Sequence, residues 1–82
     1  MDRDQITQEL QPIFAKIFRN PDIQITDDLN AEQVSGWDSL THLSMIADVE
    51  SHYGVKFKLK ELIGMKNVGD MIDLILTKKG AA

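Results

Sequence analysis

The sequence predicts an all-α fold: a small antiparallel bundle of three main helices plus one short helix, with a long loop between helices 1 and 2. Two observations support this class. Apolar residues recur at helical spacing in three separate segments. Ile23 and Ile25 alternate as in a strand, but no partner strand is evident elsewhere in the chain. With 82 residues, the chain is expected to form one domain, 1–82, with a flexible tail at 79–82.

The first helix is predicted from the apolar periodicity of residues 6–18. Asp2 or Asp4 is suited to cap its start. Pro12 conflicts with a regular helix, because an interior proline lacks a backbone N–H and crowds the carbonyl four residues back. We therefore expect either a kink at Pro12 or a regular part that begins a few residues earlier. The helix is expected to end at residues 20–21, Asn-Pro.

Residues 20–37 are predicted to form a loop, in which residues 28–31 are suited to a short turn of helix. A loop this long in so small a domain is usually functional or packed on itself.

The second helix is predicted to begin at Asp38 or Ser39 and to end near Tyr53, before Gly54. Its apolar residues cover an arc of roughly 220° when each residue is placed at 100° around the axis. A helix that only covers a core needs a stripe of about 100°. The surplus apolar flank must therefore meet the loop, a ligand or a partner, and it consists of Leu40, Leu43 and Ala47.

A short helix is predicted at residues 59–63, ended by Gly64. The last helix is expected to begin after Asn67 as its cap, with Asp70 completing an imperfect capping box. A clear apolar stripe follows, and the lysines at 78–79 suit the negative pole of the helix dipole.

Composition excludes several classes of function. A chain this short buries only about 60% of its unfolded surface, so a deep active site built from its own residues is not expected. The absence of cysteine excludes a disulfide framework, a thiol nucleophile and a Cys-based zinc site, and His42 and His52 cannot close a metal site alone. A net charge of −4 argues against nucleic acid and anionic membranes as partners. The sequence shows neither a signal peptide nor a membrane-spanning stretch, so a cytoplasmic location is expected. A monomer that is not an enzyme is also expected.

The negative charge is concentrated in residues 20–55, which hold seven Asp and Glu and no Lys or Arg. This is either an ordinary solvated face or a patch that steers a basic partner to the middle of the chain.

The segment Gly36-Trp37-Asp38-Ser39-Leu40 places a serine hydroxyl where the acidic loop meets the second helix. Taken alone, Asp38 and Ser39 are simply favoured helix caps. A helix start also has free backbone N–H groups and a positive dipole end, so an attached phosphate would be tolerated there. Trp37 is interpreted as a hydrophobic plug that ties the loop to the bundle.

These residues resemble the acyl carrier proteins. The resemblance rests on Gly-x-Asp-Ser-Leu opening an apolar-rich helix, Glu50 eleven residues after the serine, a Tyr-Gly-Val-x-Phe exit, and Asn-Val-Gly-Asp at 67–70. It extends from about Ile6 to Ile75. It implies a carrier that holds acyl intermediates as thioesters on a 4′-phosphopantetheine arm. A phosphopantetheinyl transferase would attach the arm from coenzyme A, and acyl-loading and acyl-transfer enzymes would then use it.

The resemblance also implies roles for individual residues. Ser39 would carry the phosphopantetheine, and Asp38 beside it would serve recognition and the cap. The residues that would bind partner enzymes are Leu40, Leu43, Ala47, Asp48 and Glu50. The residues of a candidate acyl cleft are Ile46, Leu62 and Ile63, with Ile46, Met45 and Val49 also at the family's core positions.

Thr41 and Ser44 stand where carriers of fatty-acid biosynthesis commonly have acidic residues. This departure favours a specialised lipid or polyketide-type pathway over housekeeping fatty-acid synthesis. An aminoacyl or peptidyl carrier, or an unmodified helical interaction module, remains as an alternative.

The same segment is also similar to the Gly-Asp-Ser-Leu serine hydrolases. Those need a remote Asp and His on a much larger α/β fold, and here Trp37 interrupts the block. His42, three residues after Ser39, is interpreted as a surface histidine rather than a partner in a catalytic dyad.

Overall fold

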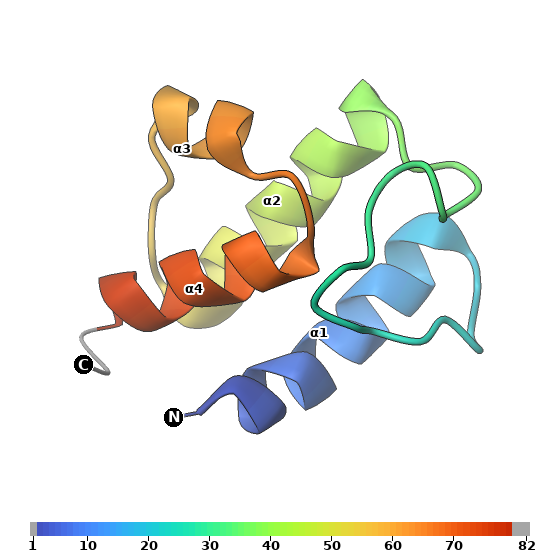
Figure 1. Ribbon diagram of the computed structural model, residues 1–82, viewed down its shortest axis with the longest axis horizontal. Coiled ribbons are helices and arrows are strands. Elements are labelled where there is room, and N and C mark those ends of the chain that lie inside the picture. Colours follow the sequence, from blue (N-terminus) through green and yellow to red (C-terminus); the bar gives the residue numbers. More distant parts are fainter. Residues whose placement is uncertain (1, 80–82) are drawn as a thin grey trace.

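The computed structural model describes residues 2–79, in which all regular secondary structure is helical. The elements are α1 (Arg3–Phe18), α2 (Ser39–Tyr53), α3 (Leu59–Gly64) and α4 (Val68–Lys78), as Figure 1 shows. The predicted all-α class, with three main helices, one short helix and a long loop after the first, is confirmed. None of the helices within residues 2–79 is long and apolar enough to cross a membrane.

Helix α1 begins at the cap Asp2, whose carboxylate accepts the backbone N–H of Gln5 at 2.8 Å. The helix continues through Pro12 without a break. It starts three residues before Ile6, the first residue of the apolar pattern that predicted it. It ends at Phe18, two residues before the expected Asn-Pro pair, because Arg19 adopts a left-handed conformation with φ 54°. The Arg19 N–H then bonds the carbonyl of Ala15.

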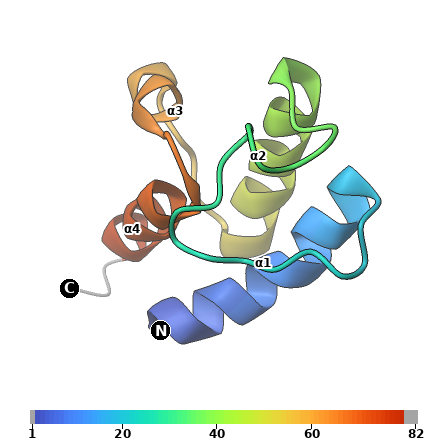
Figure 2. The ribbon, with the colours of Figure 1, turned by 45° about the vertical axis from the view of Figure 1, so that its right-hand side comes forward.

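The loop between α1 and α2 packs against the helices (Figure 2). Its apolar residues Ile23, Leu29 and Val34 are buried. The expected turn of helix at 28–31 is wrong: these residues form turns and irregular backbone instead. The physical reason is that the carbonyls of Asp27 and Leu29 accept hydrogen bonds from the first N–H groups of α4, at 2.8 and 2.9 Å.

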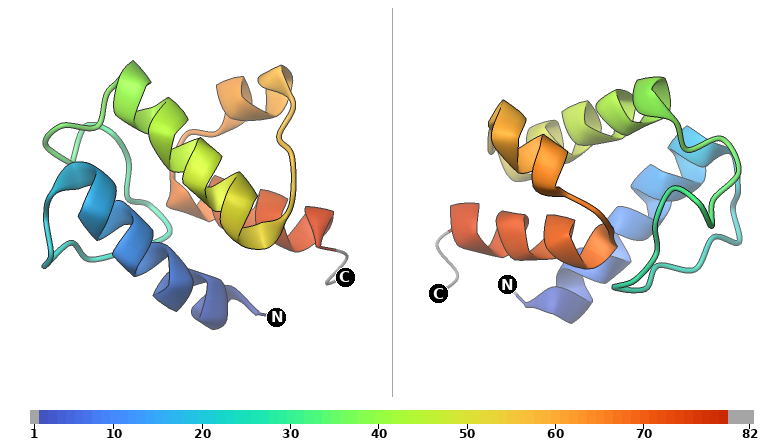
Figure 3. Two further views of the ribbon diagram at one scale, coloured as in Figure 1. Left: turned by 180° about the vertical axis from the view of Figure 1, so that it is seen from behind. Right: turned by 45° about the horizontal axis from the view of Figure 1, so that its top comes forward.

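The core lies between α1, α2, α4 and the loop. Helices α1 and α2 lie side by side along their length and run in opposite directions (Figure 3). The fully buried side chains come from these three helices: Ile6, Leu10, Phe14, Met45, Val49, Val68, Met71, Ile72 and Ile75.

Helix α3 contributes no buried residue and is held mainly through Glu61. The Glu61 carboxylate accepts the backbone N–H of Lys58 at 2.7 Å and pairs with Lys78 of α4 at 2.9 Å. Of the tail expected at 79–82, Lys79 donates its Nζ to the carbonyl of Tyr53 at 3.1 Å. Residues 80–82 lie outside the described residues.

Candidate functional site

Ser39 is the first residue of α2, and the residue before it caps the helix. The Asp38 carboxylate accepts the backbone N–H of Thr41 at 3.0 Å, and the Thr41 hydroxyl accepts the backbone N–H of Asp38 at 2.8 Å. This reciprocal arrangement is a capping box. Because Asp38 is the cap, the side chain of Ser39 is left exposed at the start of the helix.

The cap also determines the charge beside Ser39. The hydrogen bond from the Thr41 N–H lowers the pKa of the Asp38 carboxyl below its ordinary value, so the group is ionised at neutral pH. A carboxylate is stabilised at the positive end of the helix dipole. Ser39 therefore lies between a fixed negative charge and the N–H groups of the first helical turn.

Trp37 anchors the loop to α1, as predicted. Its indole meets the Phe14 ring edge-on, with centroids 5.7 Å apart, and lies 5.3 Å from the Phe18 ring. The start of α2 is thereby held close to the end of α1.

Trp37 also bonds His42, one turn into α2. The indole Nε1–H donates to His42 Nδ1 at 3.1 Å, and the two rings are nearly parallel, at 16°, with centroids 6.1 Å apart. His42 is a surface histidine whose ring is half-buried, because it lies against the indole. Burial lowers the pKa of His42, so the neutral form, which can accept this bond, is favoured.

This bond also affects the idea of a serine–histidine dyad. With Nδ1 accepting from the indole, the ring proton of neutral His42 lies on Nε2. Nδ1 is therefore not available to take a proton from Ser39.

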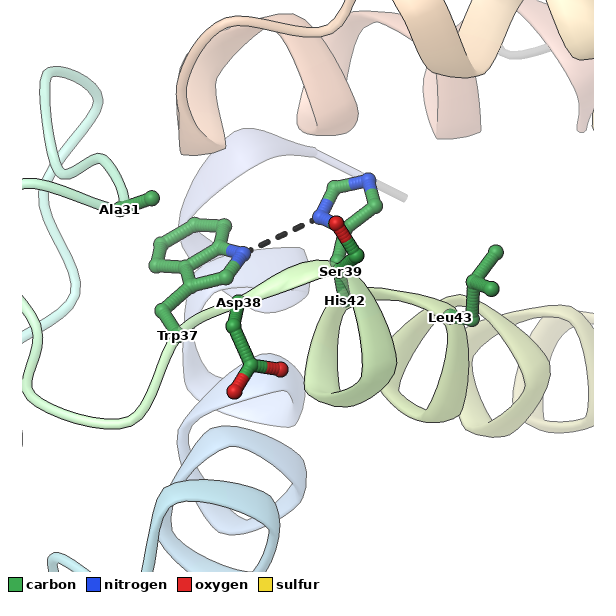
Figure 4. A pocket seen from close by; sticks show the side chains of 6 residues that line it. All are labelled: Ala31, Trp37, Asp38, Ser39, His42 and Leu43. Carbon is green, nitrogen blue, oxygen red and sulfur yellow. Dashed lines mark hydrogen bonds between the residues drawn. The ribbon is translucent and has the colours of Figure 1, made fainter.

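An open hollow of about 490 Å³ lies beside Ser39. Figure 4 shows the Trp37 and His42 rings side by side, with Ser39 in front of the imidazole and Leu43 one turn further along α2. The residues that line the hollow are Ala31, Trp37, Asp38, Ser39, His42 and Leu43.

The predicted partner-binding residues fall into two groups. Leu40, Leu43 and Ala47 are exposed, with Leu40 78% and Leu43 57% accessible. Asp48 instead pairs with Lys16 of α1 at 2.8 Å, and the Glu50 carboxylate accepts the backbone N–H of Phe57 at 2.8 Å. The two acidic residues thus make contacts within the protein.

The residues of the candidate acyl cleft also differ in how exposed they are. Ile46 is buried, Leu62 is partly buried against the core, and Ile63 is 75% exposed. Within residues 2–79, no group of three or more His, Asp or Glu is placed to hold a metal ion.

Two features of the site were missed from the sequence. The capping role of Thr41 had a local signal, because a cap residue followed three positions later by a side chain that accepts a hydrogen bond is a helix-start pattern. The Trp37–His42 pair had no such signal, because it depends on the route of the loop around α1.

The comparisons with known proteins agree with this geometry. A family model described as a phosphopantetheine attachment site matches residues 8–75. The chain belongs to the acyl carrier protein family. It is accordingly a non-catalytic carrier that bears covalently attached 4′-phosphopantetheine and interacts with a phosphopantetheinyl transferase and with acyl-handling enzymes.

Individual relatives resemble the chain over most of its length. An acyl carrier protein of Saccharopolyspora erythraea is 28% identical over 93% of this chain and 80% of its own. One from Thermotoga maritima is 28% identical over 95% and 96%. The solution structure of a holo acyl carrier protein from Geobacter metallireducens is 40% identical, covering 92% of this chain and 86% of its own, with a TM-score of 0.85.

The residues at the start of α2 fit the cofactor. An exposed hydroxyl provides an attachment point, and the adjoining N–H groups and dipole favour the negative charge of a phosphodiester. The open hollow leaves room beside the hydroxyl for the group that follows the phosphate. When bound, the cofactor supplies the thiol that a chain without cysteine lacks.

Proposed function

We propose that Ser39 is the residue that carries 4′-phosphopantetheine. The observation that carries this proposal is the capping box: Asp38 and Thr41 satisfy the helix start, so the Ser39 side chain is exposed and not needed for the fold. Ser39 also lies inside the region that matches the family.

The residues around Ser39 have distinct roles in this proposal. The hydroxyl oxygen of Ser39 becomes the ester oxygen, while the first N–H groups of α2 stabilise the attached phosphate. The ionised Asp38 keeps the helix start ordered, and its negative charge attracts complementary positive charge on the transferase.

The exposed apolar flank of α2 is proposed to be the surface that partner enzymes contact. Leu40, Leu43 and Ala47 follow Ser39 along one side of the helix and are exposed. Burial of such side chains in an interface removes apolar area from water, which favours association. Asp48 and Glu50 are proposed to act in partner binding only through long-range electrostatic attraction, since their carboxylates already have partners within the protein.

The proposed acyl cleft lies between α2 and α3. Ile46 would form its floor, with Leu62 and the exposed Ile63 on the α3 side. No residue of α3 is fully buried, and its attachments are the partial packing of Leu62 and the Glu61–Lys78 pair, so α3 is proposed as the element that moves aside for an acyl chain.

For the pathway, we propose a specialised lipid or polyketide-type system in the cytoplasm rather than housekeeping fatty-acid synthesis. Helix α2 has no acidic residue in its first turn, and its cap partner is Thr41. Thr41→Glu with Ser44→Glu would add two negative charges, and Glu at the Thr41 position keeps the capping-box chemistry. We expect a fatty-acid-type malonyl transferase to load the double variant several-fold faster than the wild type. Equal rates would contradict this assignment.

Attachment at Ser39 is tested by mass spectrometry after incubation with coenzyme A and a broad-specificity phosphopantetheinyl transferase. We expect the wild type to gain one phosphopantetheine and Ser39→Ala to gain none. Ser44→Ala is the matched control, because Ser44 is also exposed on α2, and it should be modified like the wild type. Modification of Ser39→Ala would overturn the assignment.

A further inference from the structure

The hollow beside Ser39 has an unusual wall. The Trp37 and His42 rings are nearly parallel and joined by the 3.1 Å hydrogen bond, and the indole packs on Phe14 and Phe18. A wall fixed in this way needs little further ordering when a ligand is placed against it.

The polarity of this wall is also fixed. The indole occupies Nδ1 of His42, so the neutral imidazole has its N–H on Nε2, on the side of the ring away from the indole (Figure 4). The lining of the hollow therefore combines the aromatic surface of Trp37 and His42 with the Nε2–H donor of His42, and Leu43 and Ala31 add apolar surface. Its other polar groups, on Asp38 and Ser39, lie at the attachment point itself.

Ser39 is itself one of the lining residues, so a group attached to its hydroxyl begins at the rim of the hollow. The arm of phosphopantetheine starts with the phosphate, continues with a carbon that bears two methyl groups, and then reaches its first amide. This order of chemical groups matches an apolar wall next to the attachment point, followed by a donor for a carbonyl oxygen.

We propose that the Trp37–His42 wall binds the first half of the phosphopantetheine arm. The paired methyl groups pack against the two rings, and the first amide carbonyl accepts from His42 Nε2–H. The arm then leaves the protein in a preferred direction, with its thiol end free for partner enzymes. This inference rests on the proposed attachment at Ser39.

The test compares apo and holo wild-type protein by NMR, after mass spectrometry has established the modification. Trp37 is the only tryptophan in the chain, so its indole N–H resonance is a specific reporter. We expect this resonance to shift on modification. We also expect the arm's methyl resonances to lie upfield of those of free pantetheine, because they lie over aromatic rings.

Two histidine variants provide the matched comparison. His42→Ala should move the methyl resonances toward those of free pantetheine, whereas His52→Ala, at the far end of α2, should leave them unchanged. Trp37→Phe keeps an aromatic ring but removes the donor that orients His42, and it should cause a smaller displacement than His42→Ala.

The outcomes separate the two proposals. Failure of the wild type to gain mass overturns the attachment at Ser39. A modified wild type whose indole resonance is unchanged, and whose methyl resonances coincide with those of free pantetheine, overturns the arm-binding wall alone. That result comes from the wild type and does not depend on whether a variant folds.

Discussion

Helices α2, with 15 residues, and α4, with 11, use their apolar residues differently. In α4, the side chains of Val68, Met71, Ile72 and Ile75 are all fully buried. In α2, by contrast, Leu40 is 78% exposed. Helix α4 thus buries most of its apolar residues in the core and leaves Leu74 and Leu76 partly buried, whereas α2 divides its apolar residues between the core and exposed positions.

The starts of the two helices differ in the same way. The first N–H groups of α4 bond the carbonyls of Leu29 and Asp27 in the loop. The start of α2 is capped by its own neighbours Asp38 and Thr41, with Ser39 exposed between them. A helix start that is hydrogen-bonded to a distant segment stabilises the fold. A helix start that is capped only by neighbouring residues can leave a side chain exposed for modification.

The largest expected effect is in the core of α4. Ile72→Ala removes a fully buried side chain and should lower the free energy of unfolding by about 2–5 kcal/mol. Chemical denaturation followed by circular dichroism measures this change. Ile72→Val, which should cost about 0.5–1.5 kcal/mol, gives a graded result if the alanine variant does not fold. A loss from Ile72→Ala no larger than that of the valine variant would contradict the assigned core.

The contact between α4 and the loop should be the next most sensitive to substitution. A Cβ added at Gly69 would lie 3.0 Å from the backbone oxygen of Asp27, so Gly69→Ala should cost about 1–3 kcal/mol of unfolding free energy. Gly64, in α3, is the matched control, because nothing lies within 4 Å of its added Cβ. Gly64→Ala should be neutral or slightly stabilising in the same measurement. Equal effects at the two glycines would mean that the close approach at Gly69 is not tight.

The bounds of α2 and α4 could be predicted because their signals are local. The caps Asp38 and Asn67 and the stop at Gly54 act within one turn of the chain, and the structure uses all three as helix ends. That Leu40 and Leu43 lie outside the core followed from the width of the apolar arc, because a single core can cover only one side of a helix. Their exposure was not predicted, because the arc left open whether the loop covers them.

The errors arose where contacts distant in sequence decide the structure. The expected helical turn at 28–31 does not form, because the carbonyl of Leu29 accepts the N–H of Val68, far along the chain. The environment of His42 likewise depends on the Trp37 indole, whose position is set by packing on α1. No local pattern of residues specifies either contact.

Acid should distinguish the two helix starts, since α2 is capped by a carboxylate and α4 by the amide of Asn67. The pKa of Asp38 is lowered in the folded state by the Thr41 N–H, so its stabilising effect is present above the ordinary pKa of the carboxyl. That effect is lost as the pH falls through the lowered value. Asp38→Asn keeps a capping side chain but does not titrate. We expect the wild type to lose more thermal stability than Asp38→Asn between neutral pH and about pH 3, where carboxyls with an ordinary pKa near 4 titrate. Parallel loss in both would show that Asp38 does not contribute.

The smallest effect on stability is expected on the exposed flank of α2, where the effect on function should be clear. Leu40→Ala and Leu43→Ala should each change the free energy of unfolding by no more than about 0.5 kcal/mol, because little buried surface is lost. If this flank contacts partners, each should still lower kcat/KM of the transferase about fivefold to tenfold, the equivalent of roughly 1–1.4 kcal/mol. Leu59→Ala is the matched control, since Leu59 is 73% exposed on α3. The same decrease for all three leucines would mean that exposure alone, rather than a position next to Ser39, determines the effect. A decrease confined to α2 would show that its unburied apolar surface serves partner binding.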